Sequence, residues 1–167
     1  MKQLITLTII CILIFISQSD AQYSFNSQVK NQVYFELGGF GLTYSINYER
    51  LVSENFALRG GIGVTPGLLF IDGTLFTIPV SGSYLIGGEF SKLELGIGAT
   101  YITSTDIEFF DFPAGSFSTI AIDGIIGYRG GSPEGGLVFR IAFSPMYSSE
   151  FNPNFVPYGL ISFGYGF

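Results

Sequence analysis

The feature that most constrains this chain is an alternation of apolar residues with small or polar ones, repeated along most of its length. In residues 42–49 every even position is apolar or aromatic and every odd position is polar. Residues 137–144 place Leu, Phe, Ile and Phe on one face, and Val, Arg, Ala and Ser on the other. Successive side chains of a β-strand point to opposite faces of a sheet, so a period of two predicts strands. The chain is therefore predicted to be all-β.

Eight segments carry the alternation, and the connections between them differ in length. The predicted strands cover residues 29–38, 41–52, 56–65, 75–87, 92–103, 117–129, 136–145 and 156–167. Tight connections at 53–55, 88–91 and 130–135 alternate with longer ones at 66–74, 104–116 and 146–155. An even number of antiparallel strands, with short turns at one end and longer loops at the other, is typical of a bacterial outer-membrane barrel. We therefore predict one domain, an eight-stranded antiparallel up-and-down transmembrane β-barrel over residues 29–167.

The distribution of charge favours a barrel that faces lipid. Hydrophobic residues make up 47% of the chain and charged residues only 12%, about half the usual share of roughly 25%. The charges within the predicted strands fall on the small, polar face; they are Glu36, Glu49, Arg59, Glu94, Asp123 and Arg140. The alternative is a soluble barrel of lipocalin type, which needs its apolar face inside. An apolar outer face instead suits hydrocarbon.

The first 21 residues have the organisation of an export signal. Lys2 precedes an apolar run over residues 4–16, and Ser19 and Ala21 stand at the −3 and −1 positions of a cleavage site. A membrane anchor is the alternative, but 13 apolar residues span a bilayer poorly as a helix. We predict a signal peptide over residues 1–21 and a short periplasmic lead-in over residues 22–28.

The predicted barrel resembles the small outer-membrane β-barrel proteins of Gram-negative bacteria, the OmpX-like and OmpA-barrel-like group. The stretches 33–39 and 44–50 also resemble barrels common in Bacteroidota. Chains of this group end in an aromatic residue that the barrel-assembly machinery recognises. Tyr165 and Phe167 match that signal, whereas Ser162 stands where the group usually has Gly. The resemblance implies location in the outer membrane, and contact with its lipid, but the group includes anchors, adhesins, small pores and lipid-modifying enzymes.

The six inward charges are the candidate functional residues. A tight turn at residues 53–55 places Glu49 directly opposite Arg59 on the lumen side, and Asp123 and Arg140 lie on neighbouring strands. The first interpretation is a polar network that plugs and locks the barrel, because buried charges require partners. A gated ion path is the alternative. Acid–base catalysis by the carboxylates is a third interpretation, but no histidine accompanies them.

The predicted outer loops are acidic and aromatic. They carry Asp72, Asp106, Glu108, Asp111 and Glu150, and neither Lys nor Arg. Asp106, Glu108 and Asp111 form the densest group, next to several phenylalanines. They are either solvated loop charges or a weak site for a divalent cation or an extracellular partner.

These observations predict a non-enzymatic barrel that serves a structural or interaction role through its outer loops. A narrow ion or small-solute channel is the alternative, and a lipid-modifying enzyme is the third candidate. No cofactor or metal centre is expected, since the chain has no histidine and a single cysteine. The net charge of −6 argues against binding to nucleic acid.

Overall fold

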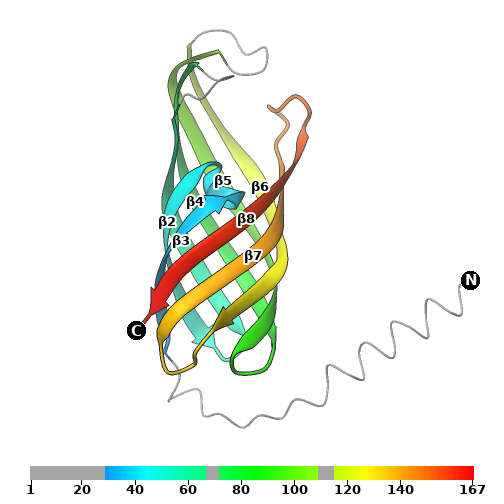
Figure 1. The fold of residues 1–167 in the computed structure, drawn as a ribbon. Coiled ribbons are helices and arrows are strands. Elements are labelled where there is room, and N and C mark those ends of the chain that lie inside the picture. Colours follow the sequence, from blue (N-terminus) through cyan, green and yellow to red (C-terminus); the bar gives the residue numbers. More distant parts are fainter. Residues whose placement is uncertain (1–28, 67–71, 109–114) are drawn as a thin grey trace, which may run out of the picture.

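The computed structural model describes residues 29–66, 72–108 and 115–167, which form one closed antiparallel barrel (Figure 1). Each strand pairs with its neighbours in sequence, and the last strand pairs with the first. The strands are β1 Asn31–Gly38, β2 Tyr44–Ser53, β3 Phe56–Thr65, β4 Asp72–Gly87, β5 Ser91–Glu108, β6 Gly115–Gly131, β7 Gly136–Tyr147 and β8 Phe155–Gly166. The predicted eight-stranded up-and-down barrel is confirmed. No helix in the described ranges is long and apolar enough to cross a membrane.

The two ends of the barrel differ as the connections predicted. The short-turn end carries the connections at 54–55, 88–90 and 132–135, and the long-loop end carries those at 66–71, 109–114 and 148–154. Strands β4, β5 and β6 rise well above the β1–β2 hairpin at the long-loop end (Figure 1). They are longer than predicted because the hydrogen-bonded ladder continues where the alternation fades, and β4 still pairs with β5 at Asp72 and Glu108. Asp72, Asp106 and Glu108 therefore lie in strands and not in loops.

The faces of the sheet have the predicted sense. The outward side chains of the strands are mainly Val, Ile, Leu, Phe and Tyr, and Ile62 and Ile97 are each 67% exposed. The inward face is lined by Ser, Thr, Asn and charged residues that are buried. A water-soluble barrel has the opposite arrangement, so this outer surface suits hydrocarbon.

The seam that closes the barrel joins the two ends of the described chain. β1 pairs with β8 from Gln32 and Gly166 to Gly38 and Leu160. Beyond the last ladder pair, the backbone amide of Phe167 donates to the carbonyl of Asn31 at 2.9 Å, and the amide of Asn31 donates back at 3.2 Å. The last residue of the chain is therefore hydrogen-bonded into the wall.

The β1–β2 connection folds into the barrel. It forms a short 3-10 helix, η1, over Gly39–Gly41, which is buried and lies against β1, β3, β4, β5, β7 and β8. Gly38 and Gly39 have φ of 77° and 66°, a region that glycine adopts without steric cost. This pair turns the chain inward, so that Phe40 is 0% exposed.

The interior is layered along the barrel. Leu51, Ala57 and Leu85 form an apolar cluster at the short-turn end. Phe40, Ile125, Ala142 and Leu160 form a second in the middle, and Leu42, Leu75, Ile102, Ala121 and Met146 form a third toward the long-loop end. The ion-paired charges Glu49, Arg59 and Glu94 lie next to the first cluster in the ladders, and Asp123 lies opposite Met146 of the third.

Candidate functional site: the charged lumen

Four ion pairs, among the residues that the structure describes, link carboxylates and guanidiniums across the lumen. Glu49 pairs with both Arg129 and Arg140, the latter at 2.8 Å between Oε2 and Nη2. Arg140 also pairs with Glu94 at 2.7 Å. These four side chains are almost completely buried. They come from β2, β5, β6 and β7, so the network ties together strands on different sides of the barrel.

The fourth ion pair joins Arg59 to Glu36, and other side chains also contact Arg59. Its Nη1 lies 3.1 Å from Oε2 of Glu36 and donates to the hydroxyl of Tyr34 at 3.2 Å. Its Nε donates to the hydroxyl of Ser81 at 3.0 Å. The Phe40 ring centroid is 4.3 Å from the guanidinium carbon, which is close enough for a cation–π interaction. Arg59 thus connects the charged layer to the η1 segment.

Cross-strand register and ion pairing differ at this site. Glu49 is the direct partner of Arg59 in the β2–β3 ladder, as the turn length predicted. The two residues form no ion pair with each other. Arg59 reaches past β2 to Glu36 of β1, and Glu49 reaches across the lumen to Arg129 of β6 and Arg140 of β7.

Asp123 lies in the lumen but outside these ion pairs. Its Oδ2 is 2.7 Å from the hydroxyl of Thr100, which is also 3.2 Å from the carbonyl oxygen of Phe40. The register places Asp123 opposite Met146 and places Arg140 opposite Arg129. Asp123 and Arg140, expected near one another, therefore have separate partners.

Inward glycines make room for η1. A Cβ on Gly98 would lie 2.9 Å from the ring of Phe40, and a Cβ on Gly63 would lie 2.8 Å from the carbonyl oxygen of Gly41. Both distances are shorter than real Cβ atoms tolerate. We call Gly63 and Gly98 the glycine cradle, since their missing side chains leave the space that η1 fills. The hydroxyl of Thr77 completes the cradle by donating to the carbonyl of Gly41 at 3.3 Å.

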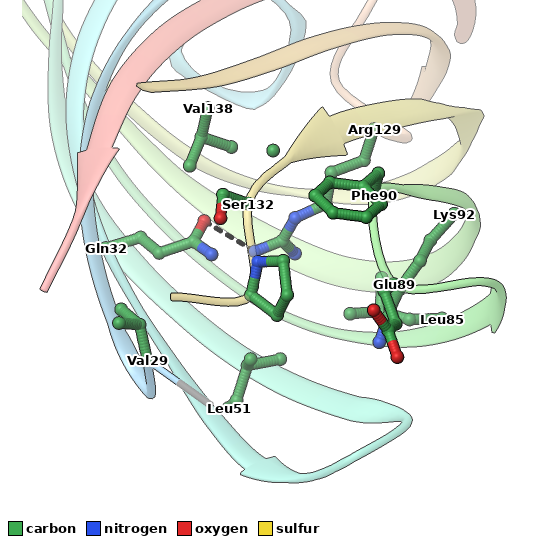
Figure 2. A pocket seen from close by; sticks show the side chains of 12 residues that line it. Val29, Gln32, Leu51, Leu85, Glu89, Phe90, Lys92, Arg129, Ser132 and Val138 are labelled. Atoms are coloured by element: carbon green, nitrogen blue, oxygen red, sulfur yellow. Dashed lines mark hydrogen bonds between the residues drawn. The ribbon is translucent and has the colours of Figure 1, made fainter. Parts of the chain in front are cut away.

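A small cavity opens at the short-turn end of the barrel (Figure 2). Its volume is about 50 Å³, and its lining includes Gln32, Phe90, Lys92, Arg129 and Ser132. Figure 2 shows the Arg129 guanidinium directed at Gln32, to which it donates a hydrogen bond. The inner end of the cavity is therefore formed by Arg129, which belongs to the charged network.

Arg129 and Phe40 are among the members of the site that the sequence analysis missed. Arg129 has the same parity as Asp123 in β6, so its inward direction was readable, but it stood at the edge of the predicted strand. Phe40 lies in a connection that the alternation does not describe. Its neighbours Gly38 and Gly39 indicate a turn, and nothing in the local sequence indicates that the turn enters the lumen.

The other candidate residues lie away from the lumen or outside the description. The side chains of Tyr165 and Phe167 point outward and are more than half exposed. Asp106 and Glu108 are in the final part of β5, where only the backbone is described. Asp111 falls outside the described residues, as do the predicted signal peptide and lead-in.

The arrangement is that of a structural network. The three inward arginines each contact a carboxylate, and Asp123 contacts a hydroxyl. Guanidinium–carboxylate contacts in a dry interior are strong when formed and costly to break singly. The four ion pairs therefore link side chains of β1, β2, β3, β5, β6 and β7 inside the barrel.

Comparison with solved structures finds the same fold in a bacterial β-barrel domain. The N-terminal β-barrel domain of Pseudomonas aeruginosa OprF matches with a TM-score of 0.60 and 13% identity, over 84% of this chain and 98% of that one. Ail, the attachment invasion locus protein of Yersinia pestis, matches with a TM-score of 0.44 and 15% identity, over 82% of this chain and 92% of that one. No protein-family model and no curated protein sequence matches the chain. The chain thus has the barrel fold of the OprF domain.

Proposed function

We propose that this protein is a non-enzymatic outer-membrane barrel with a closed lumen, which presents acidic and aromatic loops outside the cell. The short-turn end faces the periplasm in this proposal, and the long-loop end faces outward. The observation that carries it is the combination of an apolar outer face with an interior filled by ion pairs and by Phe40.

The apolar outer face supports location in a membrane. Exposed Ile, Leu, Val and Phe side chains lie along all eight strands, a surface that water would drive to aggregate. Tyr48, Tyr84 and Tyr128 are exposed on the same face toward the short-turn end, where an interfacial aromatic belt is expected. Closure of the barrel gives the backbone N–H and C=O groups hydrogen-bond partners, which hydrocarbon cannot supply.

The contents of the lumen support a closed barrel. Eight strands enclose a space that side chains can fill, whereas aqueous porins use about 16 strands. The cavity at the short-turn end, about 50 Å³, has room for only about three water molecules. The glycine cradle is occupied by η1, and the charged residues above the cavity are engaged with one another.

The reach of β4, β5 and β6 beyond the β1–β2 hairpin supports an interaction role (Figure 1). These strands carry the acidic positions Asp72, Asp106 and Glu108 away from the rest of the barrel. Acidic residues at this end of the barrel suit a cationic partner, or a divalent cation that bridges to an anionic one.

Single-channel recording of the purified barrel in a planar bilayer tests the closed lumen. We expect no steady openings in the wild-type protein. Arg140→Gln is the informative variant because Arg140 contacts two carboxylates, and its loss is expected to produce current. Arg50→Gln is the control, since Arg50 is exposed on the outward face of β2. Steady cation-selective openings of the wild type, lost on replacing Glu94 or Asp123, would support a narrow channel instead.

A further inference from the structure

Arg50 is a charged residue on the otherwise apolar outer face of the barrel. It is exposed, and it lies on the same side of β2 as Tyr44, Ile46 and Tyr48. Among the side chains described in the strands, it is the only charged one that points outward. A cation at the middle of the lipid-facing surface destabilises a barrel, and this cost nearly vanishes at the interface. Arg50 therefore marks the level of the interface at the short-turn end.

Arg50 is also unpaired. Within the described ranges, its side chain makes no ion pair or hydrogen bond. The inward arginines, in contrast, all contact carboxylates. An arginine kept outward and unpaired in an apolar surface has its five N–H donors available to a ligand.

The neighbours of Arg50 add polar groups on one side and apolar groups on the other. Asn31 is its direct partner on β1, and Oδ1 of Asn31 accepts a hydrogen bond from the Tyr48 hydroxyl at 2.7 Å. This bond leaves the amide N–H groups of Asn31 as further donors. Leu58, the partner of Arg50 on β3, and Val52 are both exposed and apolar.

We propose that Arg50 and Asn31, with Asn31 held by Tyr48, bind the phosphodiester of a phospholipid in the periplasmic leaflet. A guanidinium forms paired hydrogen bonds with phosphate oxygens. Leu58 and Val52 flank the polar group with surface for acyl chains, so the ligand is a lipid headgroup and not free phosphate. The proposal rests on the proposed membrane location and orientation.

Native mass spectrometry of the barrel in a maltoside detergent tests this site without a membrane. The probe is dimyristoyl phosphatidylglycerol, titrated against wild type, Arg50→Gln and Lys92→Gln. Lys92 is the matched control, because it is a cation at the same end that lines the interior cavity. We expect Arg50→Gln to bind the lipid about five-fold more weakly, the effect of one cation at an anionic membrane surface. Lys92→Gln is expected to bind like the wild type.

Two further probes separate the sources of the phosphate. Dimyristoyl glycerol, which lacks the phosphate, is expected to show no difference between wild type and Arg50→Gln. Inorganic phosphate at the same concentration is expected not to displace the phospholipid. Equal phospholipid binding by wild type and Arg50→Gln would overturn the site. Recovery of the protein outside the outer membrane fraction would instead overturn the proposed function, whatever the binding result.

Discussion

Glu49 faces Arg59 directly across the β2–β3 ladder, and yet the two residues form their ion pairs with other partners. Arg59 reaches Glu36 on β1, while Glu49 reaches Arg129 on β6 and Arg140 on β7. In a wide sheet the cross-strand neighbour is the nearest partner available. In a narrow barrel, strands beyond the immediate neighbour are also within reach, so the ion pairs connect strands that share no ladder, and those of Glu49 cross the lumen.

The first prediction compares two double-mutant cycles in urea unfolding. Arg59→Met with Glu36→Gln is expected to show a coupling energy within the range of about 0.5–3 kcal/mol seen for contacting residues. Arg59→Met with Glu49→Gln is expected to show a smaller coupling, because these residues share no ion pair. A larger coupling for the second cycle would mean that the register partner governs the pairing.

The second prediction concerns the glycine cradle. Gly98→Ala places a Cβ 2.9 Å from the Phe40 ring and 2.5 Å from the carbonyl oxygen of Val80, and overpacking of this kind costs about 1–3 kcal/mol. Gly60→Ala is the control, since nothing lies within 4 Å of its added Cβ. Urea midpoints at a constant m-value measure both changes. Equal midpoints for the two variants would show that η1 can shift to accommodate the added Cβ without loss of stability.

The third prediction separates two roles of the last residue. Deletion of Phe167 removes both backbone hydrogen bonds to Asn31, whereas Phe167→Ala keeps them and removes only the ring. We expect the deletion to lower the folded fraction in outer membranes more than the substitution does. The heat-modifiable band on an unboiled gel reports the folded fraction. An equal loss in both variants would assign the whole effect to the aromatic ring, as an assembly signal requires.

The fourth prediction concerns export. Ser19 and Ala21 predict cleavage after Ala21, so the intact mass of the membrane-extracted protein is expected to correspond to Gln22–Phe167. Ala21→Arg is expected to retain the larger precursor. A wild-type mature protein that still contains Cys11 would refute this cleavage site.

The alternation predicted the strands and their faces because every strand of a closed barrel has one face toward the outside and one face toward the lumen. Each of these two environments favours the same kind of side chain along the whole strand. Leu137, Phe139 and Ile141 point outward and Arg140 inward, as the period requires. The ends of β4, β5 and β6 were predicted less well. Their outer segments are rich in Ser, Thr and Gly, so the hydrophobic contrast fades while the hydrogen-bonded ladder continues.

The lumen was predictable in composition but not in its contacts. The parity of a residue tells which side chains enter the barrel, and this applies to Arg129 as well as to Arg140. The partner of each charge depends on the tilt of the strands and on what else fills the space. Phe40 fills much of that space, and its position depends on the direction in which the turn at Gly38 and Gly39 takes the chain.

The pairing between β1 and β8 also determines when the barrel can close during its formation. Residues 32–38 find their partners at residues 160–166, so β1 remains a bare edge until β8 has been synthesised. Bare edges recruit strands from other chains, and contacts this distant in sequence form slowly. Closure of the barrel therefore waits for β8, and in the proposed membrane location the apolar outer face must be shielded from water until it meets lipid.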